Sequence, residues 1–184
     1  MTAPSLDRWL PGDPPPDEQV RRMIRVDQAG EFGATRIYAG QLRVLGDRPV
    51  GDRIRHLAEQ EAVHKAEFDR LLVARRVRPT LLSPLWHVAG FALGAGTALL
   101  GERAAMACTV AVEEVIDEHY RDQHMALGDH EPALAATIET FRAEELEHRD
   151  IGLASGAEAT PGYAALTAAI KLGSKLAIWL STRV

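Results

Sequence analysis

The chain has a single cysteine, few aromatic residues and no excess of basic charge. Cys108 has no partner for an intrachain disulfide, so nothing points to an oxidising compartment, and it is predicted to be a small buried hydrophobe. The net charge of −5 does not favour nucleic acid as a partner. With 184 residues, 46% of them hydrophobic, the chain has the length and composition of one globular domain with a proper core.

The first 16 residues lack the features of a targeting segment. They contain five prolines and acidic residues, but neither an apolar run of secretory-signal length nor the Arg-rich pattern of a transit peptide. We therefore expect residues 1–16 to be a flexible leader and residues 17–184 to form a single domain.

Strand patterns are absent, whereas helical periodicity is strong. Apolar residues recur at steps of three and four within residues 51–76 and 131–155. Each stripe contains one Glu-x-x-His motif, Glu61-Ala-Val-His64 and Glu145-Leu-Glu-His148, where a helix core would normally have leucine. A buried, ionised carboxylate without a partner is strongly unfavourable, so these groups must be neutral, paired or bound to a cation.

Two further helices are predicted to direct a glutamate inward. One spans residues 17–45, with the aspartate at its first position as the cap, and carries Glu31 on its apolar face. The other spans residues 101–127 and carries Glu113, whereas Glu114 falls on a more polar face. The first inward glutamate precedes its motif by 30 residues and the second by 32, which indicates one helical hairpin used twice.

Four residues close to these glutamates have open interpretations. Asp27 is either a hydrogen-bond partner of a ligand histidine or exposed at the end of the bundle. Gly30 and Gly33 flank Glu31 and indicate either the close approach of another group to the backbone or tight helix packing. Tyr120 either lines a substrate path or is a core tyrosine.

Residues 79–101 contain no charged side chain. Their length is sufficient to span a bilayer, but a span would place the two halves of the repeat on opposite sides of the membrane. We therefore predict a crossover of the kind that ferritin-like bundles need. Because this segment would lie outside the bundle, we expect a peripheral membrane contact, with the preceding arginines and the Lys171 and Lys175 pair near anionic headgroups.

The predicted fold is all-α: a ferritin-like four-helix bundle with an apolar crossover helix and an additional C-terminal helix. Six inward side chains are candidate metal ligands: Glu31, Glu61, His64, Glu113, Glu145 and His148. Four carboxylates match the charge of two divalent cations, and carboxylate with imidazole suits iron or manganese. Glu31 and Glu113 are expected to be terminal ligands, and Glu61 and Glu145 to bridge. The alternative is that some of these groups form buried ion pairs without metal.

Three segments resemble the demethoxyubiquinone hydroxylase family of ubiquinone biosynthesis: residues 23–42 (MIRVDQAGEFGATRIYAGQL), 84–120 (PLWHVAGFALGAGTALLGERAAMACTVAVEEVIDEHY) and 144–153 (EELEHRDIGL). The similarity extends from about Arg21 to the C-terminus. Two positions depart from it, because Gln28 stands where the family often has His and Phe32 where it often has Tyr.

The resemblance implies a membrane-attached monooxygenase that hydroxylates the ring of a polyprenylated demethoxyubiquinone or its quinol with O₂, in the penultimate step of ubiquinone biosynthesis. It implies that the six side chains bind two iron ions, with reducing equivalents from NADH. It also implies a homodimer or a complex with a lipid-presenting accessory protein. The expected location is the cytoplasmic face of a bacterial inner membrane rather than the mitochondrial inner membrane.

Other functions would use related features. A ferritin-like ferroxidase or iron-binding protein would have nearly the same ligands, but a polar exterior that residues 79–101 contradict. A rubrerythrin-type peroxide reductase commonly carries a Cys-rich domain, which a single cysteine excludes. A non-catalytic, membrane-associated lipid-binding bundle would hold no metal.

Overall fold

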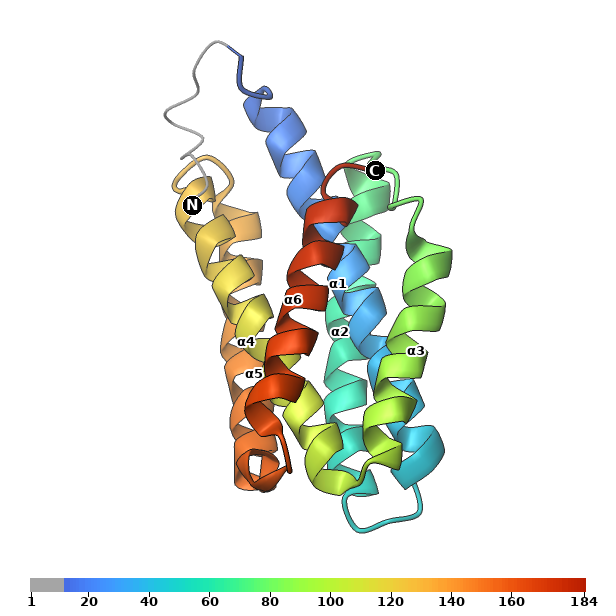
Figure 1. Cartoon of the computed structure of the whole chain (residues 1–184). Helices are drawn as coiled ribbons and strands as arrows, with labels where there is room; N and C mark the ends of the chain where they lie inside the picture. The colour runs from blue at the N-terminus through green and yellow to red at the C-terminus, as the bar shows by residue number, and fades with distance from the viewer. Residues whose placement is uncertain (1–11) are drawn as a thin grey trace.

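The computed structural model describes residues 12–184, and these residues form helices without a β-strand (Figure 1). The helices are α1 (Pro16–Leu45), α2 (Gly51–Ala74), α3 (Ser83–Leu99), α4 (Glu102–Leu127), α5 (Pro132–Ala154), the short 3-10 helix η2 (Ala157–Ala159) and α6 (Tyr163–Ser181). The predicted all-α fold is confirmed. Residues 1–11 of the predicted leader lie outside the described part, and the boundary of the domain stays a prediction.

α1 begins one residue earlier than predicted and is not capped by Asp17. Pro16 occupies its first position, where a missing N–H removes no intrahelical hydrogen bond. Asp17 and Glu18 lie in the first turn instead. Their carboxylates are favourable there because the N-terminus of a helix carries partial positive charge.

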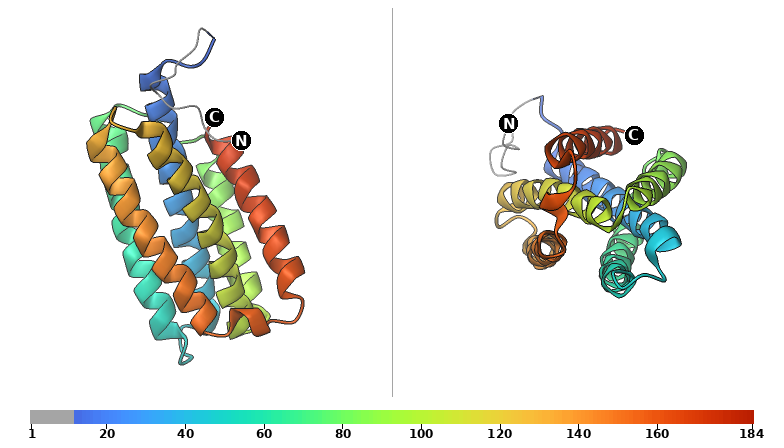
Figure 2. Two further views of the ribbon diagram at one scale, coloured as in Figure 1. Left: turned by 90° about the vertical axis from the view of Figure 1, so that its left-hand side faces the viewer. Right: turned by 60° about the horizontal axis from the view of Figure 1, so that its bottom comes forward.

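α1, α2, α4 and α5 form the four-helix bundle, and α3 and α6 lie outside it (Figures 1 and 2). α2 and α4 run in the same direction because α3 returns along the bundle between them. α3 packs against α1, and α6 packs against α4. The predicted crossover is therefore present, although only Ser83–Leu99 of residues 79–101 is helical. Gly101, at φ 117°, allows the sharp reversal into α4.

The contact between α1 and α3 is made at close backbone distance through glycines. A Cβ atom on Gly94 would overlap the carbonyl oxygen of Ile37, and one on Gly40 would overlap the carbonyl oxygen of Phe91. Glycines at these positions lower the helix propensity of both segments. In the structure they are the positions where α3 approaches α1.

Adding a methyl group at this contact is expected to destabilise the fold. Gly94→Ala should lower the free energy of unfolding by about 1–3 kcal/mol, because the new Cβ forces α3 away from α1. Gly96→Ala is the matched control on the same helix, since no atom lies within 4 Å of its Cβ position. The control should be neutral or more stable by up to about 1 kcal/mol. Urea unfolding measures both variants, and equal stability would contradict the contact.

Apolar layers close the bundle on both sides of its middle. On α2, Ile54 and Leu57 belong to one buried cluster and Phe68 and Leu72 to another, and all four side chains are at most 7% exposed. The Glu61–His64 motif lies between the two layers along the helix. Polar groups at this level of the bundle are therefore shielded from water at both ends.

Cys108 lies in a third buried cluster between α1, α4 and α6. Its side chain is fully buried, and burial raises the pKa of its thiol to about 12. The predicted role as a small buried hydrophobe is confirmed.

Candidate metal centre

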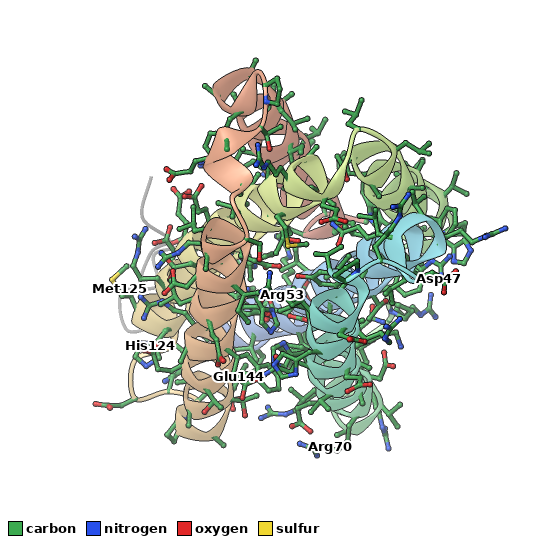
Figure 3. The ribbon with its side chains drawn as sticks, turned by 90° about the horizontal axis from the view of Figure 1, so that it is seen from below. Asp47, Arg53, Arg70, His124, Met125 and Glu144 are labelled. Carbon is green, nitrogen blue, oxygen red and sulfur yellow. The ribbon has the colours of Figure 1, made fainter. Side chains whose placement is uncertain are left out.

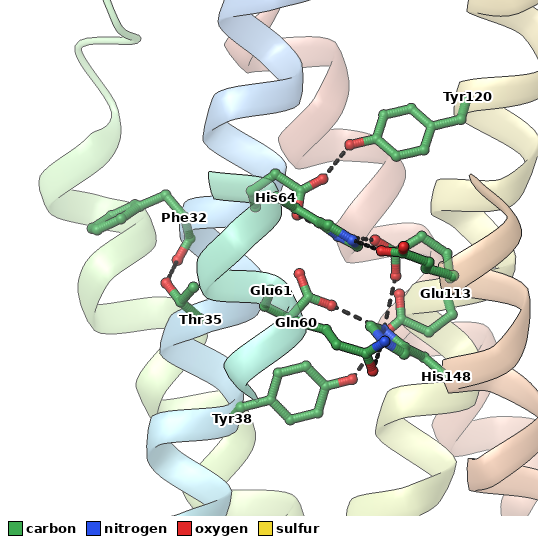
Figure 4. Close-up of polar contacts among 12 residues, drawn as sticks. Phe32, Thr35, Tyr38, Gln60, Glu61, His64, Glu113, Tyr120 and His148 are labelled. Atoms are coloured by element: carbon green, nitrogen blue, oxygen red, sulfur yellow. Dashed lines mark hydrogen bonds and ion pairs between the residues drawn. The ribbon is translucent and has the colours of Figure 1, made fainter. Parts of the chain in front are cut away.

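All six predicted ligands are buried and lie together inside the bundle, and Figure 4 shows Glu61, His64, Glu113 and His148 among them. α1 contributes one glutamate, α4 another, and α2 and α5 one Glu-x-x-His motif each: Glu31, Glu113, Glu61 with His64, and Glu145 with His148. Each side chain is at most 2% exposed. The choice of Glu113 over its neighbour is confirmed, because Glu114 pairs with Lys171 of α6 instead.

The six side chains form two overlapping groups, each with one ligand atom per residue and all of these atoms within 4.8 Å of one another. One group is Glu31, Glu61, His64 and Glu145, and the other is Glu61, Glu113, Glu145 and His148. Glu61 and Glu145 belong to both. This is the geometry that the predicted arrangement requires, with two shared carboxylates between two cation positions and one terminal glutamate and one histidine on each side.

Several carboxylate oxygens in the cluster have no hydrogen-bond donor among the described residues. They are both side-chain oxygens of Glu61 and Oε2 of Glu31. Glu61 Oε1 lies 3.2 Å from Nδ1 of His148, without hydrogen-bond geometry. Buried polar groups are normally satisfied, and a carboxylate oxygen that lacks a donor is suited to a cation. The donor set therefore fits a pair of divalent metal ions.

Without a cation, the cluster is neutralised by protons. Burial, followed by the charges of neighbouring carboxylates, raises the pKa of Glu61 and of Glu113 well above the usual value of 4.5. Burial also raises the pKa of Glu145. Burial opposes the charge on His64, but hydrogen bonds and charge from Glu145 and Glu31 raise its pKa from 6.5 to about 11. The protons neutralise carboxylates that would otherwise repel one another as ions.

Both histidines are held from outside the cluster through their second ring nitrogen. His64 Nε2 donates to Glu144 at 2.5 Å, and His148 Nε2 donates to Gln60 Oε1 at 3.0 Å. Glu144 lies on the side of α5 that faces α2 (Figure 3). Because carboxylate and amide oxygens only accept, Nε2 of each ring carries a hydrogen, while Nδ1 faces the cluster and lies 3.0 Å from Glu145 Oε1 in His64 and 3.1 Å from Glu145 Oε2 in His148. The bond from Nε2 is the outer hydrogen bond that orients a metal-binding imidazole.

These two outer partners of the histidines were not predicted from the sequence. Each lies four residues before a motif histidine and directly before a motif glutamate, so the fuller pattern is Gln/Glu-Glu-x-x-His. The hydrogen bonds run between the two motifs. Gln60, before the first motif, accepts from the histidine of the second, and Glu144, before the second motif, accepts from the histidine of the first. The repeated pattern was a usable signal, but the crossing needs the tertiary structure.

Two buried tyrosines hold the two glutamates that are not shared. The Tyr38 hydroxyl donates to Glu113 Oε1 at 2.9 Å, and the Tyr120 hydroxyl donates to Glu31 Oε1. Both tyrosines are 1% exposed. Tyr120 therefore has the position of a core tyrosine, and it does not line the apolar cavity of about 600 Å³ described below.

Asp27 is neither exposed nor a partner of a ligand histidine, so both predicted interpretations are wrong. It is 2% exposed, and its Oδ1 accepts from Gln123 at 2.7 Å and lies 3.1 Å from Nε2 of His119. Asp27 is buried because it shares the inward face of α1 with Ile24 and Glu31. Its partners were not predicted, because they come from α4, 92 and 96 residues away along the chain.

A large apolar cavity of about 600 Å³ lies between α1, α3, α4 and α6. Its walls include Gly30 and Gly33 of α1, Trp86 of α3, Val112 of α4 and Ile170 of α6. No atom lies within 4 Å of the Cβ position of Gly33, which faces the cavity, but Gly90 of α3 packs against the Gly33 carbonyl oxygen, where a Cβ on Gly90 would come within 2.9 Å. The predicted tight helix packing is therefore present at the backbone of Gly33. The absence of a side chain leaves room for the cavity beside the backbone that carries Glu31.

The fold and the site together define a ferritin-like bundle that buries four carboxylates and two imidazoles in a paired, metal-compatible cluster. Residues 18–181 match the family model described as "Ubiquinone biosynthesis protein COQ7". The chain belongs to this family, and the family predicted from the sequence is confirmed.

The curated relatives are hydroxylases. A protein from Rhodospirillum rubrum named "3-demethoxyubiquinol 3-hydroxylase" is 65% identical over 176 residues, which cover 95% of this chain and 83% of the relative. The human "NADPH-dependent 3-demethoxyubiquinone 3-hydroxylase, mitochondrial" is 55% identical, covering 90% and 78%. The "5-demethoxyubiquinone hydroxylase, mitochondrial" of Saccharomyces cerevisiae is 44% identical, covering 89% and 77%. The chain is thus a member of a hydroxylase family of ubiquinone biosynthesis.

Proposed function

We propose that this chain is a di-iron monooxygenase that hydroxylates the ring of a polyprenylated demethoxyubiquinone or its quinol, 2-polyprenyl-3-methyl-6-methoxy-1,4-benzoquinol, with O₂. The observation that carries the proposal is the buried cluster of four carboxylates and two imidazoles beside a large apolar cavity. The names of the relatives give the same substrate class for those proteins. One oxygen atom of O₂ enters the ring and the other leaves as water, so the reaction also needs two electrons and two protons.

We assign the two metal positions to the two side-chain groups, with Glu61 and Glu145 shared between them. When bound there, paired iron ions supply the redox chemistry that activates O₂. The chain's own residues hold the carboxylates in position and keep water out of the site. Tyr38 and Tyr120 fix the two terminal carboxylates, and the apolar layers above and below exclude water. The human relative's name specifies NADPH, whereas the resemblance implied NADH, and we propose a reduced nicotinamide as the ultimate electron source.

The outer partners of the histidines yield a prediction about metal affinity. Gln60→Ala and Glu144→Ala should each weaken iron binding about 10–100-fold, because each leaves one imidazole without the hydrogen bond that orients it. Glu147→Ala, at an exposed position on the same helix as Glu144, is the control and should leave affinity unchanged. Anaerobic titration with Fe(II) measures all three. Unchanged affinity in both partner variants would show that the outer bonds do not orient metal ligands.

The apolar cavity suits the polyprenyl tail. Its walls are largely glycine, alanine and aliphatic side chains, and it runs between the bundle and the two outer helices, α3 and α6. A tail in this cavity would be removed from water along its length, which favours binding by about 25 cal/mol per Å² of buried apolar surface. The ring would then lie at the α1–α4 wall that separates the cavity from the metal cluster.

We further propose that α3 and α6 rest on a membrane, at the cytoplasmic face of a bacterial inner membrane. Both helices border the cavity, and both expose large apolar side chains, among them Leu85 at 52% and Leu172 at 72%. By length and composition alone, α6 is also long and apolar enough to cross a membrane. Lys171 and Lys175 are not free for headgroups as predicted, because they pair with glutamates of α4.

A vesicle assay tests the membrane contact. The double variant Leu85→Glu and Leu172→Glu should pellet several-fold less with anionic phospholipid vesicles than the unmodified chain, since charge on the contact surface opposes insertion of the outer helices. Val73→Glu is the matched control, an exposed apolar residue of α2 outside the proposed contact. Equal pelleting of all three proteins would contradict the proposal.

A homodimer, or a complex with a lipid-presenting accessory protein, is a proposal that rests on family resemblance. Sedimentation equilibrium of the purified chain, alone and with detergent-solubilised membrane extract, tests it. A monomer in both conditions would argue against either assembly.

The proposed function is tested by the quinone that a cell accumulates. In a bacterium that lacks its own demethoxyubiquinone hydroxylase, the demethoxy precursor should accumulate, and expression of this chain should restore ubiquinone as identified by mass. A Glu61→Ala variant should not restore it. Continued accumulation of the precursor with the folded, membrane-bound chain present would contradict the assignment.

A further inference from the structure

A small space lies between α1 and α4, next to the apolar cavity on one side and to Glu113 of the metal cluster on the other. It is lined by Ala34, Ile37 and Tyr38 of α1 and by Thr109, Val112 and Glu113 of α4. Ala34, Ile37 and Val112 also line the large cavity, whereas Tyr38 and Glu113 belong to the polar interior. The space is too narrow for a water molecule as it stands. A substrate ring that moves from the cavity toward the metals must therefore pass the side chains of Ile37 and Val112.

Thr109 has an unusual hydroxyl in this space. Its side chain is 1% exposed, and its Oγ1 has no hydrogen-bond partner among the described residues. Other helical threonines satisfy their hydroxyls within their own helix: Thr97 donates to the carbonyl of Leu93 and Thr167 to that of Tyr163, in each case four residues earlier. A fully buried hydroxyl without a partner is unfavourable by about 1–3 kcal/mol, so it needs a reason.

The structure shows why Thr109 does not donate to its own helix in the same way. The carbonyl four residues earlier, that of Ala105, already accepts a hydrogen bond from Nε2 of Gln41 at 3.1 Å. Gln41 is fully buried on α1, so this side chain takes the acceptor that a helical threonine normally uses. The Thr109 hydroxyl is left available to a group in the space between Ile37, Val112 and Glu113.

The other polar groups around the cavity lie away from the metal cluster. Ser174 and Ser181 are on α6 and Trp86 is on α3, and the indole N–H of Trp86 donates to Ser181 Oγ at 2.9 Å. None of them is on α1 or α4, the two helices between the cavity and the cluster. Two hydroxyls of α1 and α4 line the cavity or the small space, those of Tyr38 and Thr109; the Tyr38 hydroxyl donates to Glu113, and the Thr109 hydroxyl has no partner among the described residues.

We propose that Thr109 is a positioning residue that donates a hydrogen bond to a ring oxygen of the substrate at the entrance to the metal cluster. The inference rests on the proposed function, since it takes the ring to be a methoxy-substituted benzoquinone or its quinol. The hydroxyl fixes the ring's rotation, so that one ring carbon faces the cluster while the tail stays in the apolar cavity. Ile37 and Val112 close the entrance when no ring is present.

The test measures binding to the full-length, iron-loaded chain under anaerobic conditions, so that no turnover occurs. Isothermal titration calorimetry measures the binding of each probe. Two probes separate ring from tail: a methoxy-methyl-benzoquinone with a short prenyl chain, and a prenyl alcohol of the same chain length without the ring. Thr109→Val, which keeps the volume of the side chain, should weaken binding of the quinone about tenfold and leave binding of the alcohol unchanged.

Two controls make the result specific. Thr109→Ser keeps the hydroxyl and should bind the quinone as the unmodified chain does. Thr167→Val removes a buried hydroxyl that is already bonded within α6, and it should change neither affinity. Iron content of each variant is measured in parallel, and Thr109→Val should retain the full amount.

Each other outcome overturns a defined part of the proposal. Equal loss of both probes in Thr109→Val would mean that the substitution disturbs the cavity rather than a ring contact, and no loss of either would remove the residue from substrate binding. Loss of iron with quinone affinity unchanged would make Thr109 a support for Glu113 instead. Failure of the unmodified chain to bind either probe would contradict the proposed function itself.

Discussion

Replacing Glu61 with methionine is expected to abolish iron binding and hydroxylation while making the metal-free protein more stable. Glu61 is 1% exposed, and neither of its oxygens has a hydrogen-bond donor among the described residues. In the metal-free chain Glu61 is a buried acid next to other carboxyl groups. Burial is the main cause of its raised pKa, and the charges of the neighbouring carboxylates raise the pKa further. Methionine fills a similar volume without a buried acidic group. Replacing buried charged groups with apolar side chains of similar volume commonly stabilises a protein by about 1–4 kcal/mol.

The metal-loaded protein should respond in the opposite way. Glu61 belongs to both groups of candidate ligands, so its removal takes one oxygen donor from each metal position. Activity should fall by more than about 100-fold, beyond the effect expected of an outer partner. Glu59→Met, an exposed position on the same helix, is the control and should change neither property.

Urea unfolding of the metal-free proteins, iron analysis and turnover assays together measure these effects. The opposite signs are the informative part, because general damage to the fold would lower stability and activity together. A Glu61→Met protein that binds iron normally would remove this side chain from the metal site. A metal-free Glu61→Met protein that is less stable than the metal-free unmodified chain would contradict the prediction that the burial of Glu61 is unfavourable.

The second large effect is an inverted pH dependence of stability in the metal-free protein. The pKa values of Glu61, Glu113 and Glu145 are raised in the folded state, chiefly by burial, so the folded chain holds protons that the unfolded chain releases above about pH 4.5. Stability from these groups is complete below that pH and is lost as the pH rises. Each such proton changes the free energy of unfolding by about 1.4 kcal/mol per pH unit within its window.

The two histidines act in opposite directions. His64, with its pKa raised from 6.5 to about 11, adds stability that is present below pH 6.5 and is lost as the pH rises toward 11. His148 has a pKa lowered by burial, so its contribution improves as the pH rises toward 6.5. Three carboxyl groups and His64 outweigh His148. The metal-free protein should therefore be clearly less stable at pH 8 than at pH 5.5.

Metal reverses this trend, because ligands must lose their protons to bind it. Protein loaded anaerobically with Fe(II) should gain stability between pH 5.5 and pH 8, over the range in which the metal-free protein loses it. Urea unfolding at the two pH values, with and without metal, gives the comparison. A metal-free protein whose stability rises between these pH values would show that the cluster is not held together by protons.

The set of buried carboxylates and imidazoles was predictable from the sequence because helical periodicity decides which side chains face inward. Glu113 and Glu114 are neighbours, yet their positions on the helix separated them, and the structure places Glu113 in the cluster and Glu114 in an ion pair with Lys171. The same reasoning gave the crossover, since two identical hairpins with inward acids can share one site only if the connection returns along the bundle.

Contacts between distant helices were not predictable in this way. The buried position of Asp27 follows from its place on α1, but its partners His119 and Gln123 come from α4, and no local pattern specifies them. The crossed bonds of Gln60 and Glu144 likewise depend on how α2 and α5 face one another. Periodicity reports which way a side chain points and does not report what it meets there.

Glycines show the same limit. Gly33 and Gly94 both lie inside helices, and both lower helix propensity to a similar extent. In the structure, Gly94 allows one helix to touch another, while Gly33 leaves an open cavity beside the backbone. A glycine inside a helix indicates that a side chain is unfavourable at that position. Only the neighbouring helices decide whether the glycine allows a helix–helix contact or leaves space for a cavity.

The metal content of the intact protein shows whether the six buried side chains hold paired cations. The chain should be loaded anaerobically with Fe(II), freed of unbound metal and analysed for iron per folded chain, with Glu61→Met prepared alongside. The predicted result is two iron ions per chain, with Mössbauer parameters of a coupled pair after oxidation, and their loss in the variant. A correctly folded chain that takes up no iron, or equal uptake by the variant, would contradict the claim.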